Sequence, residues 1–123
     1  MRRARWPILI AMLSACSAVQ DSNPDFGSAI ADETSAAGAL AAASIEADQF
    51  CVIEPYSDDA AIAETIGFDW PGAAEQTGIG TTDGKELVVA TEDDRVVAWA
   101  MVPRGLGTNL TDDGYGCLPV ESE

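Results

Sequence analysis

Histidine is absent from the 123 residues of this sequence. Its absence removes Ser-His and Cys-His catalysis and every metal site built on histidine. Neither Gly78-Ile79-Gly80 nor Gly105-Leu106-Gly107 continues into a phosphate-binding fingerprint, so we interpret both as loop glycines. Paired carboxylates could still serve a glycosidase, but 21 acidic residues make chance pairs unavoidable. We therefore expect a protein that is not an enzyme and holds no cofactor.

Basic residues are scarce, because six lysines and arginines stand against 21 acidic residues and give a net charge of −15. Half of them, Arg2, Arg3 and Arg5, lie at the very start of the chain. No cluster of positive charge is left to bind phosphates, so we expect no nucleic-acid partner. An acidic surface is typical of a soluble protein, and it also attracts a cationic protein partner.

The start of the chain has the three parts of a secretory signal. Three arginines precede the apolar run from Trp6 to Leu13, which ends in the small residues Ser14 and Ala15. The residues Leu13-Ser14-Ala15-Cys16 resemble the lipobox of bacterial lipoproteins. In that family the chain is cut before the cysteine, whose thiol carries a diacylglycerol with acyl chains such as palmitate. The resemblance implies a signal peptide over residues 1–15, with Cys16 as the lipidated first residue of the mature chain.

Two other interpretations of this segment stay open. A retained transmembrane helix is disfavoured, since the uncharged stretch Trp6 to Gln20 has 15 residues and a bilayer requires roughly 20. An ordinary signal peptide could instead be cut after Ala18. The lipoprotein family implies a bacterial cell envelope and a membrane contact through the acyl anchor at Cys16. Because Ser17 and not aspartate follows the cysteine, we expect the outer membrane, with the domain in the periplasm.

Removal of residues 1–15 leaves three basic and 21 acidic residues, a net charge of −18. It also leaves two cysteines, Cys51 and Cys117, besides the lipidated one. Two thiols in an exported protein usually pair, and a bridge closing 66 residues stabilises the fold by about 4 kcal/mol in the chain-entropy model. A free reactive thiol is the rival interpretation, but no basic neighbour is present to hold a thiolate. We predict a disulfide.

The mature chain divides into two parts in this interpretation. Residues 16–47 form a lipidated tether, polar at first and then rich in alanine, which favours a marginal helix but leaves disorder open. Residues 48–123 form the folded domain. A buried strand is predicted over Gln49–Glu54, and the stretch from Phe68 to Gly84 is rich in turn residues.

A short helix is predicted over residues 58–66. Ser57 has the character of an N-cap, and Gly67 is a natural residue to end the helix. Ile62 and Ile66 share one face of it. Negative charge is favourable in a first helical turn, so the pair Asp58-Asp59 indicates capping rather than catalysis.

The runs Glu86–Thr91 and Arg95–Val102 predict a β-hairpin with Asp93-Asp94 as its turn. In a regular hairpin, Val88 and Ala90 share one face with Val97, Trp99 and Met101. The other face carries Leu87, Val89, Val96 and Ala98. Because both faces are apolar, the hairpin is either covered on both sides or carries a partner on one. Val88, Val97, Trp99 and Met101 are the candidate interaction surface.

The segment from Asn109 to Val120 can be compared with a calcium-binding EF-hand loop. Asn109, Thr111 and Asp113 fit its first ligand positions, but the twelfth position holds Val120 where a bidentate carboxylate is required. We therefore predict no metal site here, and a polar loop that runs to Gly116 and leads into a last strand at Cys117-Leu118.

These observations predict an α+β fold with a small, mainly antiparallel sheet and one short packed helix, closed by a disulfide. The expected function is that of a non-catalytic lipoprotein with an acidic periplasmic domain, structural or protein-binding, whose partner is cationic or another envelope protein. The alternative is an inhibitor of a cationic hydrolase such as lysozyme.

Overall fold

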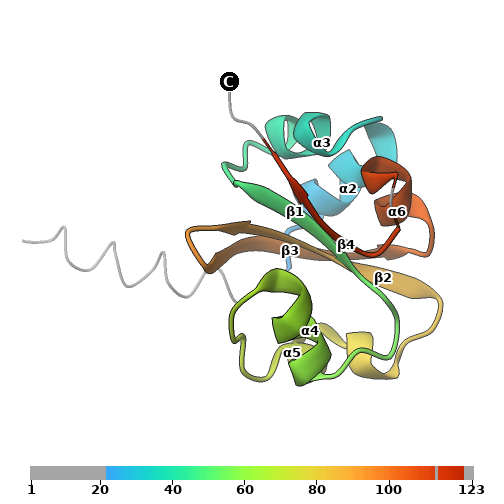
Figure 1. Cartoon of the computed structure of the whole chain (residues 1–123). Helices are drawn as coiled ribbons and strands as arrows, with labels where there is room; N and C mark the ends of the chain where they lie inside the picture. Colours follow the sequence, from blue (N-terminus) through green and yellow to red (C-terminus); the bar gives the residue numbers. More distant parts are fainter. Residues whose placement is uncertain (1–21, 113, 121–123) are drawn as a thin grey trace, which may run out of the picture.

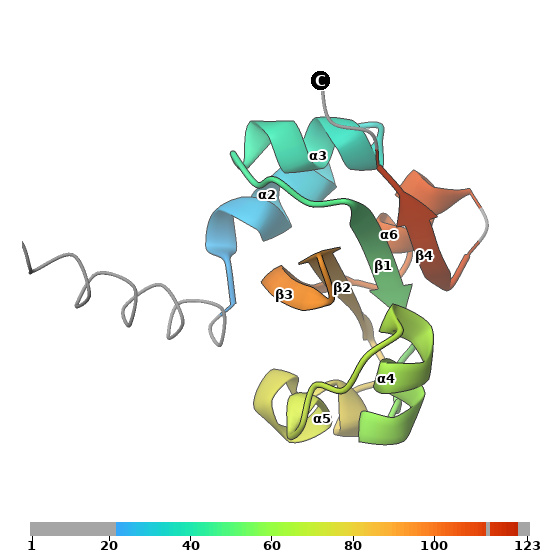
Figure 2. The same ribbon diagram turned by 60° about the vertical axis from the view of Figure 1, so that its left-hand side comes forward.

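The computed structural model describes residues 22–112 and 114–120, so the expected signal peptide over residues 1–15 and the expected lipidation site Cys16 lie outside the described residues. Four strands form one antiparallel sheet in the order β3-β2-β1-β4, and helices cover both of its faces (Figures 1 and 2). In chain order the elements are α2 (Pro24–Asp32), α3 (Ala36–Ala42), β1 (Gln49–Ile53), α4 (Asp59–Ile66), α5 (Ala73–Thr77), η1 (Ile79–Thr81), β2 (Lys85–Glu92), β3 (Arg95–Pro103), α6 (Leu106–Thr111) and β4 (Gly116–Pro119). The predicted α+β class is confirmed.

Strands β2 and β3 form the predicted hairpin, closed by the pair Glu92 and Arg95. The turn residues Asp93 and Asp94 both have positive φ, 55° and 60°. A two-residue turn of this kind matches the twist of the strands, and aspartate tolerates the left-handed region better than most residues. The acidic turn therefore has a geometric reason.

The predicted division of the hairpin into two faces is right up to Val97 and wrong beyond it. Thr91 lies opposite Val96, but Ala90 lies opposite Ala98, so one extra residue is inserted in β3. A bulge of this kind moves every following side chain to the other face. Trp99 and Met101 consequently share a face with Val89 and not with Val88.

Helices α4 and α5 cover one face of the sheet, which we call the α4/α5 face. Its buried residues are Cys51, Ile53, Ile62, Ile66, Trp70, Ala73, Ile79, Leu87, Val89, Val96 and Trp99. Helix α4 confirms the prediction over residues 58–66, and Gly67 ends it with φ 94°. The N-cap is Asp58, not Ser57: the Asp58 carboxylate accepts from the Ala61 N–H, whereas the Ser57 hydroxyl donates to the Glu54 carbonyl.

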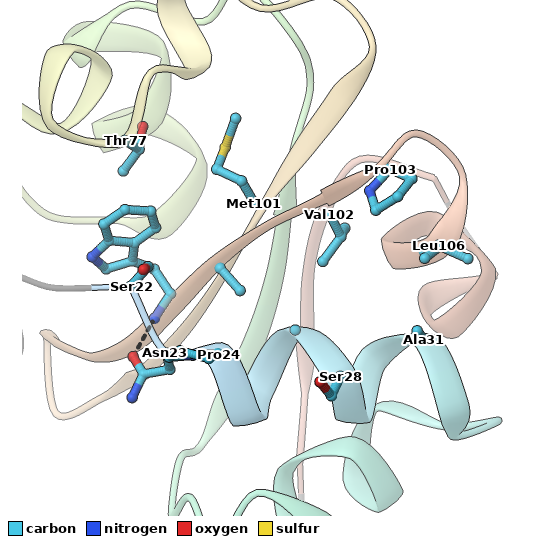
Figure 3. A pocket seen from close by; sticks show the side chains of 13 residues that line it. Ser22, Asn23, Pro24, Ser28, Ala31, Thr77, Met101, Val102, Pro103 and Leu106 are labelled. Atoms are coloured by element: carbon cyan, nitrogen blue, oxygen red, sulfur yellow. Dashed lines mark hydrogen bonds between the residues drawn. The ribbon is translucent and has the colours of Figure 1, made fainter.

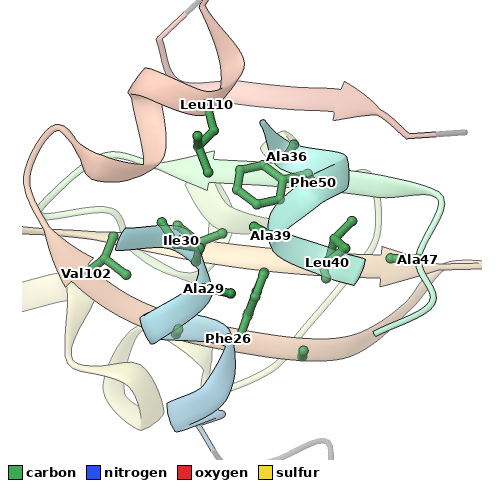
Figure 4. Packing of buried hydrophobic residues seen from close by; sticks show 14 of the residues in the cluster. Phe26, Ala29, Ile30, Ala36, Ala39, Leu40, Ala47, Phe50, Val102 and Leu110 are labelled. Carbon is green, nitrogen blue, oxygen red and sulfur yellow. The ribbon is translucent and has the colours of Figure 1, made fainter. Parts of the chain in front are cut away.

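Helices α2, α3 and α6 cover the opposite face, the α2/α3/α6 face, whose packing is seen in Figure 4. Its buried residues are Phe26, Ala29, Ile30, Ala36, Ala39, Leu40, Ala47, Phe50, Val52, Val88, Ala90, Ala98, Ala100, Val102 and Leu110. Phe26 is fully buried, and its ring meets that of Phe50 edge to face at 6.0 Å. Residues 24–47 therefore pack as part of the domain where a tether was expected. Helix α2 packs on β3 and α3 packs mainly on α2, and small alanines allow this close packing with few large apolar residues.

Helix α6 occupies part of the segment for which a polar loop was predicted. The carboxylate of Glu86, almost fully buried in β2, accepts hydrogen bonds from the N–H groups of Gly107 and Thr108 at 3.1 and 3.3 Å. Gly107 belongs to the helix and not to a loop. A Cβ at this position would lie about 3.0 Å from the Val88 side chain, so glycine allows α6 to lie directly on the sheet.

The predicted disulfide is confirmed. Cys51 and Cys117 lie directly opposite each other on β1 and β4, with their Cα atoms 3.9 Å apart. The sulfur of Cys117 also lies 3.2 Å from the backbone oxygen of Thr65 in α4. The bridge thus joins an edge strand to a central strand, on the face that α4 covers.

Candidate functional site

The candidate interaction surface does not exist as one face. Val88 is buried beneath α6 on the α2/α3/α6 face, and Val97 packs against the same cluster. Trp99 and Met101 lie on the α4/α5 face, where Trp99 is 6% exposed. The bulge in β3 is the reason, because the inserted residue moves the side chains of Trp99 and Met101 to the face opposite to that of Val88 and Val97. The hairpin is covered on both sides.

A groove of about 630 Å³ runs along β3, within the range of ligand sites in proteins (Figure 3). Helix α2 forms one wall, and Thr77 of α5 and Leu106 of α6 lie at its margins. The residues lining it are Ser22, Asn23, Pro24, Gly27, Ser28, Ala31, Thr77, Trp99, Ala100, Met101, Val102, Pro103 and Leu106, none of them charged. The consecutive β3 residues from Trp99 to Pro103 all line this groove, although their side chains point alternately to opposite faces of the sheet. The groove therefore follows the edge of the strand.

The edge of β3 is paired at one point only among the described residues. The Asn23 N–H donates to the Trp99 carbonyl at 2.9 Å, and the Trp99 N–H donates to the Asn23 side-chain oxygen at 3.3 Å, as the dashed line in Figure 3 marks. The backbone groups of Trp99 thus point away from β2. On a strand, the backbone N–H and C=O groups of residues two apart point in the same direction, and the pairing of β3 with β2 is regular from Ala98 to Pro103. Met101 consequently directs its N–H and C=O out of the sheet, into the groove.

A buried donor lies beside this edge. The indole nitrogen Nε1 of Trp99 has no hydrogen-bond partner within the part of the chain that the structure describes. Its ring lies 6.3 Å from that of Trp70. Buried donors are almost always paired in folded proteins, so this unpaired group sets the site apart from the rest of the core.

The rim of the groove is acidic along α2. Asp25 and Asp32 are exposed, and Ser28 between them lines the groove. Residues three or four apart share one side of a helix, so the two carboxylates flank Ser28, separated by about 10 Å along the helix axis. At the Pro103 end the charge is reversed, because Lys85 lies opposite Pro103 and Arg104 follows it. The groove thus has an acidic side and a basic end.

The other polar clusters serve the fold. The Asp59 carboxylate accepts from the N–H groups of Gly72 and Ala74 at 2.9 and 2.8 Å, which caps α5 from the start of α4. The prediction that Asp58-Asp59 is a capping pair is confirmed. Among residues 22–112 and 114–120, no group of three or more acidic or cysteine side chains is placed to hold a metal ion. In the calcium comparison, Asn109 and Thr111 belong to α6, and Asp113 lies outside the described residues.

The chain matches no protein-family model, no curated protein and no solved structure. Within the described part of the chain, no helix has both the length and the apolar character needed to cross a bilayer. The function must therefore be argued from the groove and from the sequence that precedes it.

The sequence contained a signal for the wall of the groove that was missed. Asn23 followed by Pro24 and Asp25 is a typical helix start: a capping residue, proline in the first turn and an acid near the positive end of the dipole. Phe26 and Ile30, four apart, then predict one buried face. No pattern could have revealed that Asn23 pairs with Trp99, because 76 residues separate them.

Proposed function

We propose that this chain is a lipid-anchored protein of the bacterial cell envelope, whose folded domain binds another protein and catalyses no reaction. The observation that carries the proposal is the uncharged groove along an open strand edge, at the point where the chain enters the domain. Open edges and apolar grooves are features by which proteins bind extended segments of other proteins.

The fold gives the proposed anchor a short reach. If Cys16 carries the lipid, Ser22, the first residue of the groove, follows it by six positions. Six residues span at most about 20 Å, whereas the expected tether of residues 16–47 could have spanned about 110 Å. Two or more acyl chains hold a protein stably on a membrane. The groove then lies close to the membrane surface, and its partner is another protein of the same membrane.

The anchor is tested by Cys16→Ala. We expect the variant to leave the membrane fraction and to lose incorporation of a labelled fatty acid, whereas the matched control Ser17→Ala keeps both. Ser17→Asp should shift the protein toward the inner membrane, as aspartate does in the lipoprotein family. Unchanged membrane partition of Cys16→Ala would refute the anchor.

Protein binding is tested by crosslinking in intact cells, followed by purification from membranes. We expect one dominant crosslinked protein, lost when the crosslinker is omitted. Recovery of uncrosslinked protein alone would count against a binding role.

A second function is favoured by one observation, the charge of −18 that remains after residues 1–15 are removed. Such a charge steers cationic proteins toward the domain and favours inhibition of a cationic hydrolase such as lysozyme. Inhibition that weakens as salt is added is the expected signature. No inhibition of lysozyme at low ionic strength would exclude this alternative for that enzyme.

A further inference from the structure

We propose that the groove binds an extended polypeptide segment in which basic and apolar residues alternate, and that this segment adds a strand to the sheet beside β3. The inference rests on the proposed protein-binding function and names the site and the chemistry of its ligand. It follows from the edge, the walls and the rim of the groove, taken in turn.

The edge supplies the backbone contacts. Asn23 already pairs with Trp99 as a short extension of the sheet would, through one backbone and one side-chain hydrogen bond. Two residues further, Met101 directs a donor and an acceptor into open space lined by uncharged side chains. An added strand satisfies both groups, and its pairing ends at Pro103, which has no N–H to donate to it.

The two sides of the groove favour different side chains, which explains why basic and apolar residues alternate in the proposed ligand. Side chains of an added strand point in turn to the two faces of the sheet. On the α4/α5 face they meet Trp99 and Met101, where apolar residues are favoured. On the opposite face they reach toward α2, whose rim carries Asp25 and Asp32 and favours lysine or arginine. Long basic side chains also cover apolar surface with their stems while the charged ends stay in water.

The negative charge of the domain also disfavours a second copy of this chain as the occupant of the groove. Pairing β3 of one molecule with β3 of another would bring two domains of charge −18 together, with their acidic rims close to each other. Repulsion of this kind disfavours the pairing, most strongly at low ionic strength. A basic segment gains from the same field.

The central test uses a synthetic peptide of four Lys-Val repeats, blocked at both ends, and the protein purified in the form that cells produce. We expect saturable binding by calorimetry, accompanied by a change in tryptophan fluorescence, since Trp99 lines the groove. The same peptide with N-methyl groups on alternate backbone amides should bind about tenfold more weakly in one of its two methylation registers, because one edge hydrogen bond is lost. Equal binding of both methylated peptides would overturn strand addition.

Met101 offers a matched pair of variants. Met101→Pro removes the N–H that faces the groove and leaves the bonds to β2, which come from the neighbouring residues. We expect Met101→Pro to bind the peptide about tenfold more weakly than Met101→Ala, which loses the same side-chain contact but keeps the N–H. Thermal unfolding of both variants shows whether the fold is intact. If Met101→Pro folds and binds as Met101→Ala does, the edge is not the site.

The rim is tested by Asp25→Asn with Asp32→Asn. At low ionic strength we expect about fivefold weaker binding of the Lys-Val peptide, and a smaller effect in high salt. Glu64→Gln, an exposed acid on α4 away from the groove, is the control and should change little. A peptide of Glu-Val repeats should not bind. Equal effects of the rim and control variants would mean that the charge acts over the whole surface, and would overturn the role of Asp25 and Asp32 in binding the basic side chains.

Two further outcomes separate this inference from the function on which it rests. Peptide binding that depends on Met101 while Cys16→Ala stays in the membrane would retain the groove and reject the anchor. A crosslinked partner that is still captured by Met101→Pro would retain protein binding and reject the groove. A concentration-dependent dimer at low ionic strength, abolished by Met101→Pro, would show that a second copy occupies the edge and would overturn the proposed occupant.

Discussion

The two faces of the sheet are buried with different kinds of side chain. Alanine makes up seven of the 15 buried residues on the α2/α3/α6 face but only one of 11 on the α4/α5 face, which is built from isoleucine, valine, leucine and tryptophan. Each alanine buries little area, so the few large residues of the α2/α3/α6 face carry most of its apolar burial. The faces differ in covalent support as well, because α4 and α5 lie inside the loop closed by the disulfide and α2 and α3 lie outside it.

Both faces of the sheet are covered by helices, but the packing on the two faces is not equally resistant to substitution. The α4/α5 face is held by many large buried side chains, and the Cys51–Cys117 disulfide lies on the same face. The α2/α3/α6 face depends on a small number of side chains and on close approach of backbone, and it forms one wall of the groove. Substitutions on both faces test this difference.

Phe26→Ala should be the most damaging single change. It deletes a fully buried ring whose edge-to-face contact is with Phe50, and we expect the free energy of unfolding to fall by about 3 to 5 kcal/mol. Urea unfolding measures it. Phe26→Leu, which keeps most of the volume, should cost clearly less. A loss below about 1 kcal/mol for Phe26→Ala would restore the view that residues 24–47 are a tether.

Replacing both bridged cysteines, with Cys51→Ala and Cys117→Ala together, should lower the free energy of unfolding by about 2 to 4 kcal/mol. The loss arises mainly because the unfolded chain regains the freedom of a 66-residue loop. Chemical unfolding of the oxidised protein and the double variant at equal pH gives the value. An unchanged midpoint would mean that the packing of β4 alone holds the sheet edge.

Two glycines on helices of the same face should respond in opposite directions. In Gly107→Ala the new Cβ meets Val88, Glu86 and Val52 at 3.0 to 3.1 Å, so we expect a loss of about 1 to 3 kcal/mol. In Gly27→Ala the nearest atom is the Ala100 Cβ at 3.8 Å, an ordinary contact. Alanine is the better helix former, so this variant should gain up to about 1 kcal/mol. Thermal unfolding of the pair decides whether α6 approaches the sheet more closely than α2.

Asp58→Ala should have the smallest effect, about 1 kcal/mol, because it removes the side chain that caps α4. Ser57→Ala is the informative comparison. The Ser57 hydroxyl bonds to Glu54 and not to the helix, so its loss should leave helix α4 intact in amide exchange. A larger loss of α4 protection in Ser57→Ala than in Asp58→Ala would reverse the assignment of the cap.

The α4/α5 face could be predicted from the sequence because its signals are local. Ile62, Ile66 and Gly67 lie within one helix and its end, and the hairpin has its turn residues in place. The disulfide followed from counting cysteines. The α2/α3/α6 face could not be predicted in the same way, since alanine carries almost no hydrophobic pattern and Phe26 and Phe50 meet only in the folded state.

The groove escaped prediction for a related reason. One inserted residue near Val97 moves both Trp99 and Met101 to the face opposite to the predicted one, and nothing in the residues themselves indicates the insertion. The contact between Asn23 and Trp99 depends on where α2 lies, which tertiary packing decides. The prediction did select Trp99 and Met101 as interaction residues, but on a face and not along an edge.

The bridge between Cys51 and Cys117 also decides how the molecule responds to mechanical tension. A pull between the start of the domain at Ser22 and its end at Val120 passes from Cys117 directly to Cys51, so the segment 52–116 bears no load and cannot lengthen. Only α2, α3, the part of β1 up to Cys51 and the part of β4 from Cys117 lie in line with the force. Stretching the oxidised protein would therefore strip α2 and α3 from the sheet, taking one wall of the groove with them, while most of the chain stays at its folded length.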